Sequence, residues 1–95
     1  MKKTFTLTHP KIKYARRVDS VRNELKKYIS RELRKELPEG FDVWRFDCKF
    51  GVTADEAESI QISDISKCID GIERAQLESF YVEILAKAGH KAEGF

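Results

Sequence analysis

The chain has 95 residues, of which 41% are hydrophobic and 36% are charged, and this composition is typical of one folded domain rather than of a disordered chain. No segment approaches the ~20 apolar residues of a membrane span, and the residues after the basic start lack the apolar run of a signal peptide. The two cysteines, Cys48 and Cys68, have no CxxC spacing. We therefore expect neither a disulfide framework nor a zinc ribbon, and we expect a cytoplasmic protein.

Charge is distributed unevenly along the chain. Residues 1–37 hold 12 Lys or Arg and 4 Asp or Glu, a charge of +8, whereas residues 38–95 hold 6 and 12, a charge of −6, which together give the net +2. One interpretation is a polyanionic partner for the first half. The other is that the two halves neutralise each other within the fold.

The first half of the chain predicts a strand followed by a long helix. Phe5 and Leu7 alternate with threonines over residues 3–8, as in a half-buried strand. A helix is predicted over residues 14–37, because apolar residues recur there at steps of three or four. These residues are Tyr14, Val18, Val21, Leu25, Ile29, Leu33 and Leu37. Pro38 indicates where the helix ends.

The second half predicts two strands, a second helix and an ambiguous segment. Residues 41–50 alternate with period two, and residues 58–63 do so over a shorter run. Ser63 or Asp64 is a suitable N-cap for the second helix. Its apolar stripe consists of Ile65, Cys68, Ile69 and Ile72. Residues 79–87 match both periods, and we choose a strand, with a helix as the alternative.

These elements predict an α+β domain with the ferredoxin-like order β-α-β-β-α-β, in which both helices cover one face of a four-stranded antiparallel sheet. If the ambiguous segment is helical, the sheet has three strands and the domain ends in a helix. We expect the domain to span residues 1–88, with a flexible tail at 89–95. The side chains expected to face the helices are Phe5, Leu7, Trp44, Phe46, Phe50, Ile60 and Ile62. Those expected on the open face are Thr4, Thr6, Arg45, Asp47, Lys49, Ser59 and Gln61.

Three stretches of the sequence resemble a known family. They are Lys2-Lys3-Thr4-Phe5 with residues 7–13, Phe46-Asp47-Cys48-Lys49-Phe50-Gly51, and residues 77–87. Together they resemble a family of small uncharacterised bacterial proteins of about this whole length, a domain of unknown function. The resemblance implies a single cytoplasmic bacterial domain, and it transfers no catalytic residue.

Cations gather at two places along the predicted first helix. The loop before the helix and its first turn carry His9, Lys11, Lys13, Arg16 and Arg17. The free N–H groups and the dipole at a helix start favour anions, so cations there are unfavourable unless a phosphate joins them. Further along, Lys27, Arg31 and Lys35 follow at i, i+4 and i+8, where like charges repel. These eight residues are the predicted anion-binding set.

Two other interpretations compete with an anion site. Exposed cations are often only solvated. Alternatively, the ridge formed by Lys27, Arg31 and Lys35 can be neutralised by acids of the second helix or of a partner, such as Asp70, Glu73 and Glu78. RNA binding in the usual ferredoxin-like manner is disfavoured, because the open face carries Thr, Ser and Gln where stacking aromatics are needed.

No group of residues points to catalysis or to a metal. Cys48 alternates in phase with the apolar side chains of its strand, and Cys68 lies on the apolar stripe of the second helix, so both are predicted to be core residues. His9 and His90 lack metal-ligand spacing. We expect no catalytic residue, no metal, no cofactor and no enzymatic activity.

The leading hypothesis is a non-enzymatic binding or regulatory module that engages a phosphate-bearing ligand or a nucleic acid through its basic loop and helix. The alternative is an interaction module that forms a homodimer through its exposed sheet or an edge strand. No membrane partner is expected.

Overall fold

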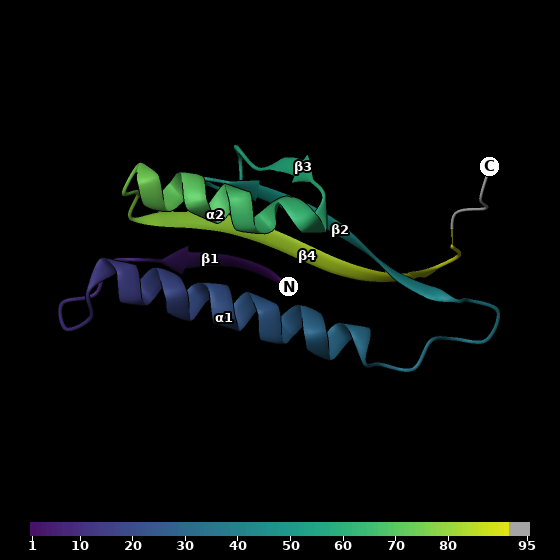
Figure 1. Cartoon of the computed structure of the whole chain (residues 1–95). Helices are drawn as coiled ribbons and strands as arrows, with labels where there is room; N and C mark the ends of the chain where they lie inside the picture. Colours follow the sequence, from purple (N-terminus) through teal and green to yellow (C-terminus); the bar gives the residue numbers. More distant parts are fainter. Residues whose placement is uncertain (92–95) are drawn as a thin grey trace.

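The computed structural model describes residues 1–91. Its elements are β1 (Lys2–Thr6), α1 (Tyr14–Leu33), β2 (Val43–Gly51), β3 (Glu58–Ile60), the 3₁₀ turn η1 (Ile62–Asp64), α2 (Ile65–Arg74) and β4 (Ser79–Gly89). Figure 1 shows an elongated molecule in which both helices run along the sheet. The α+β class and the ferredoxin-like order β-α-β-β-α-β are confirmed.

The strands lie in the order β1-β4-β2-β3, and all neighbours are antiparallel. Because β1 and β2 are both antiparallel to β4, they run parallel to each other with β4 between them. In the same way, β2 separates β3 from β4. Each helix therefore connects two parallel strands that are split by a third one, as expected for a split β-α-β arrangement.

The segment 79–87 is a strand, and the alternative of a three-stranded sheet is wrong. Phe80, Val82 and Ile84 are fully buried at 0% exposure, whereas the residues between them lie on the opposite face. The period of two prevails over the helical period because β4 pairs with β1 along one edge and with β2 along the other. A strand with neighbours on both sides satisfies its backbone groups and buries its apolar side chains together.

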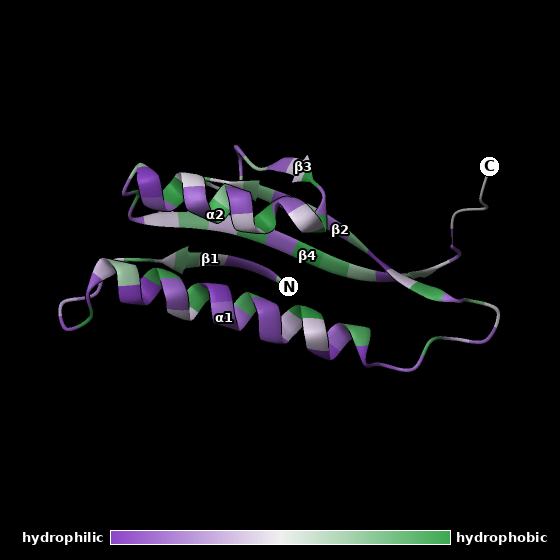
Figure 2. Cartoon of the chain, in the orientation of Figure 1, coloured by the Kyte–Doolittle hydropathy of each residue, from purple (hydrophilic) through white to green (hydrophobic). Residues whose placement is uncertain are grey.

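Both helices cover the same face of the sheet. Their apolar residues recur on one side of each helix (Figure 2), and the buried ones are Val18, Val21, Leu25, Ile65, Ile69 and Ile72. The predicted inward set of strand residues lies on this face, with Phe5, Leu7 and Phe50 buried and the others partly buried. The ring of Phe80 stacks on Phe5 at 5.5 Å and on Phe50 at 4.9 Å between centroids, which joins the edge strand β1 to the central strands β4 and β2 in one core.

α1 ends at Leu33, so the predicted end at Leu37 is wrong by one turn. Pro38 disfavours helical geometry at the residue before it, and the backbone tightens to i→i+3 bonds, such as Lys35 N–H to the Glu32 carbonyl at 3.2 Å. Leu37 follows the helical period because its side chain is partly buried, although its backbone is not helical.

The strand predicted at residues 58–63 is shorter than expected, because β3 ends at Ile60 and Ile62 begins η1. The strand predicted at 41–50 is β2, shifted to Val43–Gly51. β4 includes Gly89, and beyond it the Lys91 N–H donates to Asp42 Oδ1 at 2.8 Å. The remainder of the predicted tail, 92–95, lies outside the described residues.

The start of α1 is tied to the end of α2 through Tyr14. Its hydroxyl lies 2.9 Å from the Leu77 carbonyl oxygen and 3.2 Å from that of Ile72, so it donates one proton between two acceptors. α2 ends there in a Schellman motif, with Leu77 N–H donating to Ile72 O at 3.1 Å and Gln76 N–H donating to Glu73 O at 3.0 Å. Burial, and then the charge of Glu73, raise the pKa of Tyr14.

Tyr14→Phe should lower the free energy of unfolding by about 1 to 2 kcal/mol, because it removes the hydroxyl from two carbonyls at the helix end. Since the pKa of Tyr14 is raised in the folded protein, its contribution is present below pH ~10 and is lost as the pH rises through the raised value. Urea titrations at neutral and alkaline pH would show this, and the variant should lose less stability above pH ~10 than the wild type. Equal stability of both proteins at neutral pH would contradict the role of the hydroxyl.

Gln76 is the non-glycine residue with a left-handed backbone in the described chain, at φ 52°. Gln76→Gly should raise the free energy of unfolding by about 0.5 to 1 kcal/mol, because glycine adopts this geometry at the helix end without strain. Gln76→Ala is the control, since it retains the strained Cβ while shortening the side chain. A gain in thermal or urea stability in both variants would point to the side chain and not to the backbone.

Candidate anion-binding surface

α1 has 20 residues and is therefore about 30 Å long. Its inner side is buried on the sheet, and its outer side carries exposed cations along most of its length. We call these residues, together with the C-cap residue Arg34, the cationic face: Arg16, Lys26, Lys27, Arg31 and Arg34. Within residues 1–91 none of them belongs to an ion pair. The face is thus open to a negatively charged partner along one side of the helix.

Two shallow depressions follow the cationic face. The first is lined by Arg16 and Lys27 and also by two acids, Asp19 and Glu24, with Ser20 and Asn23 between them. The second is lined by Lys26, Lys27, Arg31 and Arg34 around Ser30. The structure therefore brings the predicted Lys27 and Arg31 together. It adds Lys26 and Arg34, which were not in the predicted anion-binding set although their i, i+8 spacing runs parallel to that of Lys27 and Lys35.

Lys35, the third member of the predicted ridge, lies beyond the end of α1 and pairs with Glu32. Its Nζ lies 2.8 Å from Glu32 Oε2, and hydrogen bonding from Lys35 lowers the pKa of Glu32. Part of its charge is thus compensated locally.

The predicted loop cations surround the start of α1. His9 closes its own turn, because its Nδ1 accepts a hydrogen bond from Lys11 N–H at 3.0 Å. Lys13 is the N-cap residue and makes no side-chain capping bond, and the first turn contains no acid. Lys11, Lys13 and Arg16 are exposed, so the expected accumulation of positive charge at a helix start is present.

Arg17 is partly buried and holds α1 against the end of β1. Its Nε donates to the Thr6 carbonyl oxygen at 2.9 Å. Arg17 therefore has a structural contact that the sequence pattern did not indicate.

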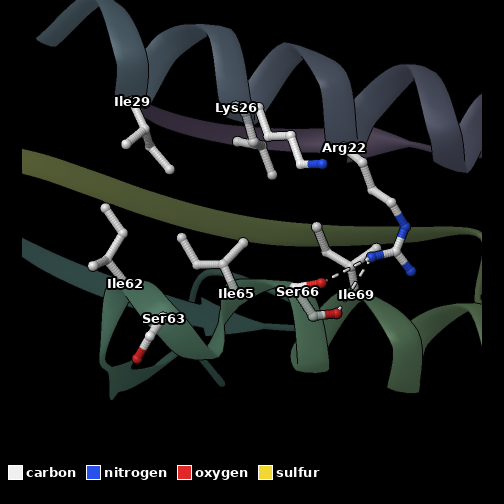
Figure 3. Close-up of a pocket in the computed structure, with 9 residues that line it drawn as sticks. Arg22, Lys26, Ile29, Ile62, Ser63, Ile65, Ser66 and Ile69 are labelled. Atoms are coloured by element: carbon white, nitrogen blue, oxygen red, sulfur yellow. Dashed lines mark hydrogen bonds between the residues drawn. The ribbon is translucent and has the colours of Figure 1, made fainter. Parts of the chain in front are cut away.

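Neutralisation between the two halves of the chain is centred on Arg22, not on the ridge. Arg22 forms ion pairs with Asp70 and, at 3.4 Å, with Glu73, and it reaches the backbone and side chain of Ser66 (Figure 3). These are two of the acids that were considered as partners of the ridge. They face the flank of α1 that packs beside α2, and of the cationic face Lys26 alone borders that flank.

The open face of the sheet is polar, as predicted from the alternation. In one row across the strands, Lys2, Glu83, Lys49 and Ser59 are register partners. Gln61 follows β3 instead of belonging to it. Tyr81 is on this face, where its hydroxyl donates to Glu83 Oε1 at 2.6 Å, and this bond raises the pKa of Tyr81. One tyrosine committed to a carboxylate does not form the aromatic platform that RNA-binding sheets use.

Both cysteines are free, with Cys48 buried and Cys68 partly buried. Burial raises the pKa of each thiol, and the charges of Asp47 and Asp64 add to the effect at Cys48 and Cys68, respectively. Neither is therefore an activated nucleophile at neutral pH. Among residues 1–91, no cluster of three or more His, Cys, Asp or Glu side chains could hold a metal ion.

Cys48→Ala should lower the free energy of unfolding by about 1 to 3 kcal/mol through lost core packing, with a smaller effect for Cys68→Ala, whose side chain is partly exposed. An aromatic disulfide reagent should label Cys48 slowly in the native protein and quickly in urea. Mass spectrometry of the labelled protein identifies the site. Rapid stoichiometric labelling of native Cys48 would contradict its place in the core.

The fold and the surface define a small α+β domain whose longest helix presents an exposed cationic face. The chain belongs to the family described as "Family of unknown function (DUF6172)", whose model matches residues 1–94. The resemblance to a family of unknown function is therefore confirmed. No curated protein and no solved structure matches this chain. In the described part of the chain, no helix is both long and apolar enough to cross a membrane.

Proposed function

We propose that this domain is a non-enzymatic binding module of the cytoplasm that engages the phosphate backbone of a nucleic acid through the cationic face of α1. One observation carries the proposal. The five cations of this face are exposed and form no ion pair within residues 1–91, although the acids of α2 neutralise Arg22 on the neighbouring flank. The acids of α2 thus lie on the neighbouring flank, and the acids beside the cationic face are Asp19 and Glu24 of α1 itself, of which Glu24 pairs with Lys3.

The length of the face suits a polyanion better than a single phosphate. Arg16 and Arg34 are 18 residues apart, which corresponds to about 27 Å along a helix. Nucleic-acid strands carry one phosphate per ~3.4 Å of duplex axis, so several phosphates can lie along this distance. Binding of phosphates relieves the repulsion between the cations of the free protein. The release of counterions adds a favourable, salt-dependent contribution to the binding free energy.

In the proposed interaction the protein contacts the phosphate backbone of the nucleic acid and not its bases. The cationic face consists of long side chains on a convex helix, and the open face of the sheet presents Tyr81 alone among the aromatic residues of the described chain. Phosphate contacts position a protein without conveying sequence information. We therefore expect similar affinity for oligonucleotides of different sequence.

Homodimerisation through the open sheet face or an edge strand stays the alternative. The charged row of Lys2, Glu83 and Lys49 makes the sheet face less suited to burial, because each charge would have to find a partner across the interface. Sedimentation equilibrium at several concentrations would detect a dimer.

Fluorescence anisotropy with a labelled mixed-sequence oligonucleotide, between about 50 and 200 mM salt, tests the proposal. We expect binding that weakens steeply with salt. Lys27→Gln/Arg31→Gln should weaken it and reduce the slope of log affinity against log salt by roughly one unit for each lost phosphate contact.

The matched control is Lys67→Gln/Arg74→Gln, which removes the same charge from exposed positions of α2. It should retain most of the affinity and slope. No binding by the wild type at low salt, or equal losses in the two double variants, would overturn the proposal.

A further inference from the structure

An apolar groove separates α1 from the start of α2, and we call it the helix groove. Its floor consists of Leu25, Ile65 and Ile69, which are 2%, 5% and 2% exposed. Its walls are Ile29 and Ile62, which are partly exposed. In Figure 3 the side chains of these two isoleucines point toward one another across the space between the helices. Arg22, which bonds to Ser66 and Asp70, borders one side of the groove, and Tyr14 joins α1 to the far end of α2.

The groove continues onto the sheet beyond the start of α2. Ile62 and Ser63 line both the helix groove and a shallower surface that includes Trp44 and Phe46 of β2. The ribbon of β2 and β4 extends further than α2, and both aromatic side chains are partly exposed. Together the groove and this surface form a trough that is longer than one side chain. Its apolar side chains, Ile62, Trp44 and Phe46, are flanked by the charged residues Arg45, Asp47 and Lys91.

The volume of the helix groove, about 180 Å³, decides what kind of ligand fits. Pockets for drug-sized molecules occupy roughly 300 to 1,000 Å³, whereas a cavity of about 150 Å³ accepts benzene. The helix groove therefore accommodates one leucine or phenylalanine side chain of a partner. Such an anchor in a largely apolar pocket is typical of a helix that docks in a groove.

In the described part of the chain, the rim of the groove carries one free cation, Lys26, because the other cation, Arg22, is paired with Asp70 and Glu73. Lys26 lines both the helix groove and the cationic face, is exposed and forms no ion pair within residues 1–91. No acid lines the groove, whose other polar residues are Arg22, Ser63 and Ser66. A partner with carboxylates beside its apolar anchor would complement this rim. A nucleobase would place polar edges against isoleucine side chains without hydrogen bonds, at a cost in free energy.

We propose that the helix groove is a docking site for an acidic amphipathic helix of another protein, which inserts one apolar side chain between Ile29 and Ile62. A second apolar side chain, about two turns away, lies on Trp44 and Phe46. Acidic residues of the docked helix face Lys26. This interaction uses a surface adjacent to the one proposed for nucleic acid, and it does not depend on that function.

The test is an NMR titration of the ¹⁵N-labelled full chain with a synthetic peptide of about 14 residues, in which leucines at i, i+4 and i+7 alternate with glutamate and alanine. We expect shifts at the amides of Lys26, Ile29, Ile62 and Ser66. A scrambled peptide of the same composition controls for general attraction between an acidic peptide and a basic helix. It should bind at least about fivefold more weakly, because its leucines do not share one helix face.

Two substitutions in the protein complete the test. Lys26→Glu should weaken binding of the leucine peptide about fivefold or more, whereas Lys67→Glu, an equal change on an exposed position of α2, should change it by less than about twofold. Ile29→Gln should weaken binding as well. If the Ile29→Gln variant is less stable than the wild type, Lys26→Glu still tests the proposal.

The docking proposal is overturned if the leucine peptide does not bind at about 1 mM, if the scrambled peptide binds equally well, or if the shifts map to Lys27 and Arg31 and not to the groove. It is also overturned if a mixed-sequence oligonucleotide moves the amides of Ile62 and Ile65, since the groove would then accept a base. Nucleic-acid binding at the cationic face can fail or succeed without altering these outcomes, because it is measured at Lys27 and Arg31.

Discussion

The insertion of β4 between β1 and β2 is the constraint on which the remaining structure depends. Residues 81–83 pair with a strand on both sides, and their neighbours Phe80 and Ile84 are fully buried. Because Lys2 is the register partner of Glu83, strands from opposite ends of the chain must meet before the sheet is complete. Contacts so distant in sequence carry the cost of closing a long loop. Both helices must cover the same face to bury the apolar side of β4.

This one-sided layering also determines where charge can be neutralised. α1 lies beside α2 along one flank only, and there Arg22 meets Asp70 and Glu73. The opposite flank of α1 faces neither the sheet nor α2, so cations at Arg31 and Arg34 remain exposed. A helix with this sequence could be fully neutralised only if a third element or a partner supplied acids. Within residues 1–91, such an element is not present.

Alternation and helical periodicity predicted most of the element order and of the buried faces, because burial on one side imposes a period directly on the sequence. They left residues 79–87 open between strand and helix, and they placed the exposed Leu33 on the buried stripe of the first helix. They could not place the end of α1, since Leu37 follows the helical period through packing alone. They also could not reveal Arg17 as a tie to β1 or Arg22 as the partner of α2. Such contacts depend on which strands become neighbours, and the strand order is a property of the whole chain.

The position of Lys26 links the two proposed surfaces physically. It lines the cationic face on one side and the helix groove on the other, so one ammonium group would contribute to both proposed interactions. A polyanion bound along the face would neutralise this charge and place phosphates beside the acidic residues of a docked helix. Since coupling between two sites is reciprocal, the docked helix would lower the affinity for the polyanion by the same factor. The geometry thus favours competition between the two partners, although each one has most of its contacts on a separate surface.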